Sequence, residues 1–383
     1  SMDPTARAAG SGMSYQEFLS AKSTAAPAAG FDPQSFIAPL FPFQRDIVTM
    51  ACRVGKFCIW ADCGMGKTAM QLEWAHQVHQ QTGGNVLILA PLAVAHQTVR
   101  EGGKFGISCS FATTQADVKP GITVTNYEKL SHFDASSFQG VVLDESSILK
   151  AYTGKIRNQI IESFSLTPYR LACSATPAPN DHMELGNHAE FIGVMTRTEM
   201  LAMFFVHDGG DTAKWRLKGH ARGKFWEWVC SWAVTIRKPS DLGYEDGDFV
   251  LPDLRIQDCT VETPREAVTD DAGQMALFAM EARTLNDQRK VRKSSLQMRV
   301  DAAAALANDN TEQWLVWCDL NDESKALTAA IDGAVEVCGS DSDDHKRQAA
   351  IDFQDGKIRV LVSKPSIFGF GLNFQRCHNV AFV

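Results

Sequence analysis

The stretch from Ile59 to Leu72, which reads IWADCGMGKTAMQL, contains the residue types that bind nucleotide phosphates. Gly64 and Gly66 let backbone N–H groups approach phosphate oxygens, and Lys67 can reach the β and γ phosphates. The Thr68 hydroxyl is suited to ligate Mg²⁺, and the start of the following helix attracts an anion. The general pattern begins with glycine where this chain has Ala61, and an ordinary Gly-Lys-Thr helix start is the alternative. The predicted ATP-binding set here is Gly64, Met65, Gly66, Lys67, Thr68 and Ala69.

Two adjacent carboxylates follow a second apolar run, in the segment GVVLDESSILK at 140–150. The run Val141 to Leu143 predicts a buried strand that delivers Asp144 and Glu145 to its carboxyl end, where ligands bind in open α/β sheets. Asp144 could hold Mg²⁺, directly or through water, and Glu145 could orient and deprotonate the water that attacks the γ phosphate. A solvated strand end is the ordinary interpretation of such a pair. The phosphate loop upstream favours the catalytic one.

Two further polar sites could complete a nucleotide-binding centre. Gln44, before the phosphate loop, has a carboxamide that can match both the donor and the acceptor of an adenine edge. Ser174 and Thr176 follow the apolar run at 170–173, and small hydroxyls there can relay hydrogen bonds from the γ-phosphate site. A surface glutamine and a plain proline turn are the alternatives.

The elements that must position these residues alternate between strands and helices. Short continuous apolar runs at 85–91 and 122–126 are typical of strands buried on both faces. The segments 68–78 and 92–104 are predicted to be helices. The pattern repeats at 314–363 and ends with a strand at 380–383. This alternation predicts parallel α/β sheets. We expect a flexible segment at 1–35, a first domain at 36–250 with a helical insertion at about 182–240, and linker helices with a second, incomplete domain at 251–383.

One basic run lies inside the expected insertion, with no carboxylate from Thr212 to Trp226. Such a run resembles the electrostatic footprint for a phosphate backbone, although a solvated basic loop is the favoured interpretation. A second basic group at 289–293 is a further candidate for phosphate contacts, with a solvated helix face again the favoured interpretation. The candidate nucleic-acid contacts are Lys214, Arg216, Lys218, Arg222 and Lys224.

The composition is that of an ordinary globular chain, with 383 residues, 45% hydrophobic residues and a formal net charge of -8. This charge argues against nonspecific coating of nucleic acid, but it allows local basic patches. Ten cysteines are scattered without a C-x-x-C pair, which predicts reduced, largely buried thiols and a cytoplasmic location. Neither a signal core nor a long apolar run is present, so we expect no membrane partner.

Five motifs together resemble the superfamily-two helicase and translocase ATPases, most closely the Swi/Snf-like branch of phage or prophage type. In chain order they are LFPFQ at 40–44, ADCGMGKT at 61–68, LDESSILK at 143–150, SATPAPN at 174–180 and SKPSIFGFGLNFQ at 363–375. The resemblance implies two RecA-like domains that clamp ATP and Mg²⁺ between them, with nucleic acid across both. Double-stranded DNA is the substrate that the branch implies.

The resemblance also implies a role for each matching residue. Gln44 would read adenine, while Lys67, Thr68, Asp144 and Glu145 would handle phosphate, Mg²⁺ and water. Coupling of hydrolysis to domain movement would involve Ser174, Thr176, Gly369, Gly371 and Asn373.

One family motif, the arginine-finger segment Q-x-x-x-R-x-x-R, is not found before Val383. Because such a finger is worth about 10³ to 10⁵ in kcat in related phosphoryl transfers, we expect weak hydrolysis from a chain truncated before it.

Taken with the five motifs, the resemblance predicts a DNA-dependent ATPase motor. The alternatives are a nucleotide-gated DNA-binding module without productive turnover, and an RNA helicase. The protein partner is not predicted.

Overall fold

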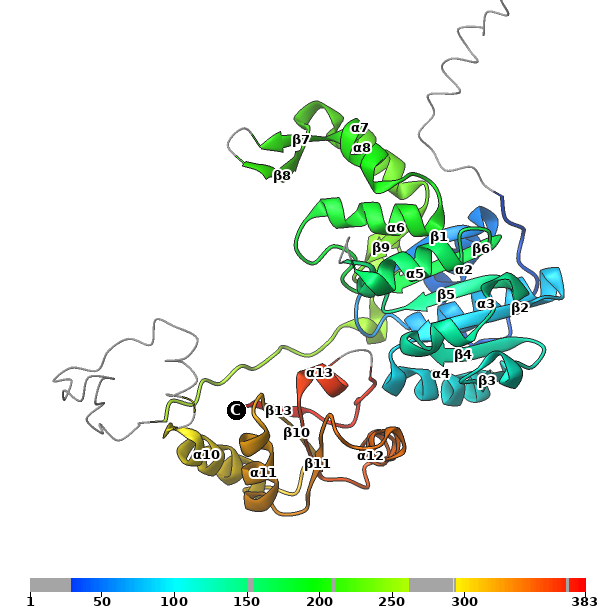
Figure 1. Ribbon diagram of the computed structural model, residues 1–383. Coiled ribbons are helices and arrows are strands. Elements are labelled where there is room, and N and C mark those ends of the chain that lie inside the picture. Colours follow the sequence, from blue (N-terminus) through cyan, green and yellow to red (C-terminus); the bar gives the residue numbers. More distant parts are fainter. Residues whose placement is uncertain (1–28, 151–153, 209–210, 262–291, 293, 370–371) are drawn as a thin grey trace, which may run out of the picture.

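Two parallel β-sheets, each flanked by helices, form the molecule and are joined by an extended segment (Figure 1). The computed structural model describes residues 29–150, 154–208, 211–261, 292, 294–369 and 372–383. The predicted α/β fold class with two parallel-sheet domains is confirmed. Most of the segment predicted to be flexible, 1–28, lies outside the described residues. Residues 29–35 differ from that prediction, because the Phe31 and Gln34 N–H groups donate to Cys52 and Gln77.

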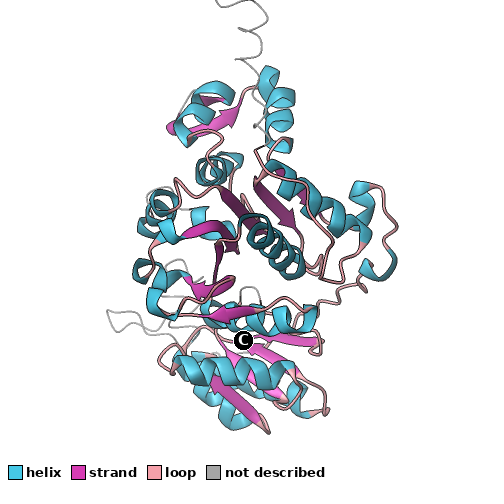
Figure 2. Ribbon diagram, turned by 90° about the vertical axis from the view of Figure 1, so that its right-hand side faces the viewer, coloured by secondary structure: helices cyan, strands magenta, loops and turns pink. Residues whose placement is uncertain are grey.

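The first sheet has seven parallel strands in the order β3-β4-β2-β5-β6-β1-β9. Its central strands are short apolar runs, buried along nearly their whole length, as expected for strands covered on both faces (Figure 2). The strands are β1 (Lys56–Ala61), β2 (Asn85–Ala90), β3 (Cys109–Phe111), β4 (Ile122–Asn126), β5 (Phe138–Asp144), β6 (Tyr169–Ser174) and β9 (Ala233–Ile236).

Helices cover both faces of this sheet, and the hydrophobic core forms two clusters. One cluster contains Trp74 and Phe43, and the other contains Trp60, Trp228 and Trp232. The helices concerned are α2 (Pro42–Val54), α3 (Lys67–Thr82), α4 (Leu92–Phe105), α5 (Lys155–Ser163) and α6 (Leu185–Ile192), with 3-10 turns η2 (Tyr127–His132) and η4 (Ser146–Lys150).

The segment predicted as a helical insertion, 182–240, is only partly helical. Between α7 (Arg197–Phe204) and α8 (Arg222–Cys230) lies an antiparallel hairpin, β7 (Phe205–Asp208) and β8 (Asp211–Leu217). Val234 also lies within this segment, but it belongs to strand β9, which pairs with β1. The short apolar stretch at 233–236 suits either element by periodicity alone, and pairing at the sheet edge decides for the strand.

Residues 250–261 form an extended, largely exposed connection to the second domain (Figure 1). The expected linker helices fall mostly on residues outside the described ones, and α10 (Leu296–Asn308) is the described helix of this linker. The second sheet has the order β11-β12-β10-β13. Its elements are β10 (Trp314–Trp317), α11 (Asn321–Ala330), β11 (Ala334–Val337), α12 (Asp343–Gln354), β12 (Val360–Ser363), α13 (Pro365–Phe368) and β13 (Asn379–Phe382).

The two domains touch through helix α4. Its Gln97 carboxamide oxygen accepts from Gln354 Nε2 at 2.7 Å and from the Asn373 N–H at 3.1 Å. One turn later, Arg100 pairs with Asp355 at 2.7 Å. Leu372 packs against the cores of both domains. These contacts define how the second sheet faces the first.

Candidate functional site

The predicted catalytic residues converge at one edge of the first sheet because their strands are neighbours. Strands β5, β6 and β1 lie side by side, and their carboxyl ends deliver Asp144, Ser174 and Ala61 to the same edge. Parallel strands bind ligands at this edge. The structure therefore brings together the phosphate loop at 61–69, the carboxylate pair at 144–145 and the segment that begins at Ser174, which are well separated in the sequence.

The loop between β1 and α3 has the backbone that its glycines permit. Gly64 and Gly66 have φ values of 84° and 78°, a left-handed region that other residues rarely adopt. A Cβ on Gly66 would also lie 2.4 Å from the Gln44 side-chain nitrogen. Lys67 Nζ donates to the backbone carbonyl of Ala61 at 2.7 Å and to that of Asp62 at 3.2 Å. The lysine thus lies over the loop, where a phosphate would replace these carbonyls as its partner.

Gln44 contacts this loop directly. Its Nε2 donates to the carbonyl of Met65 at 2.9 Å, and its Oε1 accepts from the Phe41 N–H at 3.0 Å. Both ends of the buried carboxamide are therefore engaged within the protein. The adenine contact stays a prediction, while the structure shows Gln44 as a support of the loop. Thr68 and Ala69 follow it, half-buried at the start of α3.

Asp144 is 7% exposed, and burial raises the pKa of its carboxyl to about 6. Glu145 raises the pKa further, whereas Gln71 and Lys67 lower it. The Asp144 backbone carbonyl accepts from the buried Tyr127 hydroxyl at 2.7 Å. A buried carboxyl with so little compensation is suited to receive a cation.

Glu145 has a φ of 58°, and it is the single non-glycine residue in the described ranges with a positive φ. Such a conformation costs about 1–3 kcal/mol and is concentrated at functional sites. The Glu145 Oε1 accepts from Ser147 Oγ at 2.7 Å and from Ser174 Oγ at 2.9 Å. Ser174 Oγ in turn accepts from the N–H of the exposed Thr176 at 3.0 Å. The predicted coupling segment is thus connected to the predicted catalytic carboxylate.

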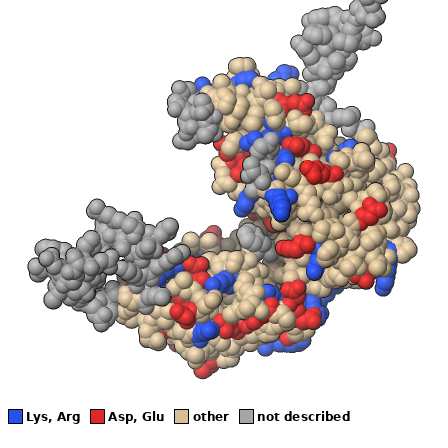
Figure 3. Space-filling model, viewed as in Figure 1, with Lys and Arg blue, Asp and Glu red and all other residues tan. Residues whose placement is uncertain are grey.

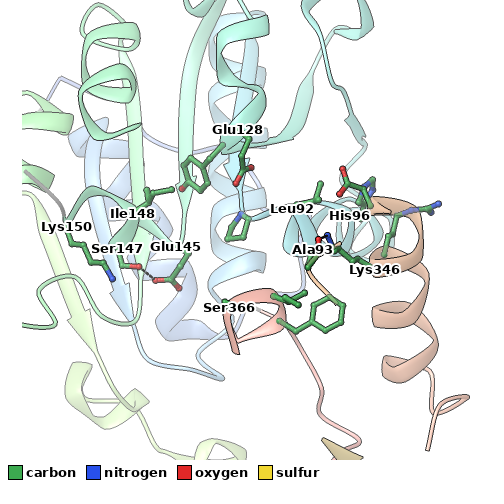
Figure 4. A pocket seen from close by; sticks show the side chains of 17 residues that line it. Leu92, Ala93, His96, Glu128, Glu145, Ser147, Ile148, Lys150, Lys346 and Ser366 are labelled. Carbon is green, nitrogen blue, oxygen red and sulfur yellow. Dashed lines mark hydrogen bonds between the residues drawn. The ribbon is translucent and has the colours of Figure 1, made fainter. Parts of the chain in front are cut away.

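A cleft of about 670 Å³ opens between the domains beside Glu145 (Figure 4). Its first-domain wall comes from the start of α4, from η2 and from the segment 145–150; its second-domain wall comes from Gly339, α12 and α13. Ser147 and Lys150 lie next to Glu145, while His96 and Lys346 lie across from each other at the far end. Phosphate-loop residues do not line this cleft. The cleft is therefore separate from the predicted phosphate-binding loop and reaches the predicted catalytic residue Glu145.

Of the second-domain residues predicted to couple hydrolysis to domain movement, Asn373 contacts the first domain. The Asn373 N–H reaches Gln97 on the first domain. Gly369 ends α13, where a Cβ would lie 2.3 Å from the Pro365 carbonyl. Gly371 lies outside the described residues.

The predicted basic run lies away from this cleft. It follows the hairpin β7–β8 into α8, at the end of the first domain remote from the second (Figures 1 and 2). Lys218 Nζ donates to the carbonyls of Ala202 and Met203 at the end of α7, and Lys224 pairs with Glu227 at 3.3 Å. Arg216 and Arg222 are exposed, and the Lys214 side chain is outside the described part. Figure 3 shows basic side chains mixed with acidic ones on both lobes around the hollow.

Sequence reasoning missed Tyr127, Gln97 and His188, which all contact motif residues. Tyr127 follows strand β4, so its place at a strand end was a usable signal. His188 and Gln97 lie within helices, and their partners Ser146 and Asn373 are distant in sequence. No local pattern could have identified them.

The donor chemistry fits ATP and Mg²⁺. A glycine loop, a lysine, a helix start and a buried carboxyl are what a magnesium-bound triphosphate needs. Among the described residues, no group of three or more His, Cys, Asp or Glu side chains could hold a metal ion. In the same residues, no helix has the length and apolarity to cross a membrane.

Comparisons with known proteins find similarity to helicases and to a phage protein. Residues 41–185 match the family model of the DEAD/DEAH box helicases. A protein of Acyrthosiphon pisum secondary endosymbiont phage 1, putative protein p41, is 22% identical over 390 residues, covering 88% of this chain and 83% of the phage protein. The predicted resemblance to helicase-type ATPases with a phage relative is confirmed.

Solved structures match both domains. The helicase MrfA bound to DNA and AMPPNP is 12% identical, with a TM-score of 0.50, and the match covers 96% of this chain and 50% of MrfA. The SWI2/SNF2 ATPase core of Sulfolobus solfataricus in complex with dsDNA is 18% identical, with a TM-score of 0.49, covering 92% and 83%. At this identity, the MrfA match supports a common fold of the two-domain helicase core.

Proposed function

We propose that this chain is an ATP-dependent motor of the Swi/Snf-like branch that moves on duplex DNA. The observation that carries the proposal is the convergence of the phosphate loop, Asp144, Glu145 and Ser174 at one sheet edge. The similar proteins include a SWI2/SNF2 core in complex with dsDNA and a helicase bound to DNA, which favours DNA as the polymer.

Each residue has a task in hydrolysis under this proposal. The loop N–H groups and Lys67 bind the triphosphate, and Thr68 with Asp144 would hold Mg²⁺, which neutralises charge that develops on the phosphates. Glu145 orients the attacking water and accepts its proton. Since Ser174 and Ser147 both donate to Glu145 Oε1, the second carboxylate oxygen is the better proton acceptor.

The interdomain cleft is the place we assign to the polymer. It begins at Glu145, which links polymer contact to the hydrolytic water. Both walls carry cations, Lys150 on one side and Lys346 and Arg347 on the other, beside the carboxylates of Glu128 and Asp343. Cations on both walls suit a phosphate backbone. The remote basic run then becomes a separate surface.

Steady-state ATP hydrolysis tests the proposal, measured with no polymer, duplex DNA, single-stranded DNA and RNA. We expect stimulation by duplex DNA, and loss of at least 10² in kcat on Lys67→Ala, because the lysine stabilises charge on the transferred phosphate. Stimulation by RNA alone would indicate an RNA helicase. ATP binding without turnover in any condition would contradict the motor and favour a nucleotide-gated binding module.

A further inference from the structure

The backbone at Glu145 needs support from outside its own strand. Its left-handed φ of 58° persists only if surrounding contacts fix it. The side chain is held by Ser147 and Ser174, but these hydrogen bonds restrain the carboxylate and not the peptide groups on either side. The contacts of the two neighbours, Asp144 and Ser146, are therefore the ones to consider.

Both neighbours are anchored by buried side chains from other elements. The Tyr127 hydroxyl donates to the Asp144 carbonyl at 2.7 Å, and Ser146 Oγ lies 3.0 Å from His188 Nε2. Tyr127 is 4% exposed, and Ser146 and His188 are fully buried. Glu145 thus lies between two buried anchors.

His188 is itself held in a fixed place. It lies on α6, which packs on strands β1 and β6, and its ring meets the Trp60 ring edge-on at a centroid distance of 5.8 Å. The next-door Asn187 donates from Nδ2 to the carbonyl of Lys150 at 3.2 Å. Helix α6 therefore contacts both ends of η4, the turn that directly follows Glu145.

We propose that His188 is a positioning residue for Glu145, acting through Ser146 to hold the backbone turn that orients the Glu145 carboxylate. The proposal rests on the hydrolytic function proposed above. His188 touches neither the loop nor the carboxylate, so its effect is on orientation and leaves nucleotide binding alone. Burial lowers the pKa of His188 to about 4, which the backbone of Glu184 partly opposes. The ring is thus neutral at physiological pH, and its contact with Ser146 is a neutral hydrogen bond.

A double-mutant cycle between His188 and Ser146 tests the proposal, with kcat, KM for ATP and the Kd of a fluorescent ATP analogue measured with duplex DNA. Ser146→Ala removes the hydrogen bond with little change in volume, and His188→Leu removes it from the other side. We expect each to lower kcat about five- to tenfold, with Kd changed less than twofold. The double variant should match the single variants, and His188→Gln should recover part of kcat.

The control is His182→Leu, a histidine just before α6 whose ring contacts Trp226 and which lies outside this network; we expect its kcat to be unchanged. Unchanged kcat in folded Ser146→Ala, multiplicative effects in the double variant, or an equal loss of ATP affinity would each overturn the positioning role. A wild-type protein without turnover, equal to Lys67→Ala, would instead overturn the hydrolytic function and this inference with it.

Discussion

At the scale of single residues, the burial of Asp144 has a measurable cost. Its pKa is raised from 3.8 to about 6, so the folded protein binds this proton more tightly than the unfolded chain does. The contribution of the Asp144 carboxyl to the free energy of unfolding is therefore highest below about pH 4 and falls as the pH rises to about 6. Above pH 6 both states are ionised, and the folded state carries the full penalty.

We therefore expect Asp144→Asn to stabilise the Mg²⁺-free protein by about 2–3 kcal/mol at pH 7.5, and by almost nothing at pH 4. Urea unfolding of the first domain at both pH values measures this difference. Asp248→Asn, at an exposed aspartate, is the control and should change little. Destabilisation by Asp144→Asn at pH 7.5 would show that Lys67 and Gln71 outweigh burial.

At the scale of elements, the positions of strands and helices explain which features the sequence could predict. The phosphate loop and the Asp144–Glu145 pair were predictable because each follows one apolar run, and a parallel strand places its carboxyl end at the ligand edge. The role of α6 was not predictable, since its polar side chains face a turn forty residues upstream. The hairpin β7–β8 was missed because alternation over four to seven residues is hidden among aromatic residues that also suit a helix.

Lys218 shows how a basic run can have two meanings. Its ammonium group donates to the last carbonyls of α7, where cations stabilise a helix end. We expect Lys218→Ala to lower the free energy of unfolding by about 0.5–1 kcal/mol and to leave the salt dependence of duplex DNA binding unchanged.

The matched variant is Arg222→Ala, at an exposed position four residues later. If the run contacts DNA phosphates, this variant should reduce the slope of log K against log salt by about one. Fluorescence anisotropy at several salt concentrations measures both variants. A reduced slope for Lys218→Ala would contradict the capping role.

At the scale of the whole molecule, the contacts of α4 set the resting arrangement of the two domains. The Arg100–Asp355 pair is about one third exposed on each side and is worth about 0.2–1 kcal/mol. Reversal of one charge should cost more, because like charges then face each other. We expect Arg100→Glu to increase the radius of gyration in small-angle X-ray scattering, and Arg100→Glu with Asp355→Arg to restore it. An unchanged radius in Arg100→Glu would show that Gln97 and Leu372 suffice.

The packing of Leu372 against both cores makes the domain contact sensitive to temperature in an unusual direction. Apolar burial is driven by entropy near 25 °C and weakens on cooling, whereas the exposed ion pair beside it is weakened by salt. The two halves of one interface therefore respond to different physical variables. Low temperature and high ionic strength together should separate the domains more readily than either alone. Sulfate is excluded from apolar surfaces and strengthens apolar burial, so its effect on Leu372 should partly offset its screening of the Arg100–Asp355 pair.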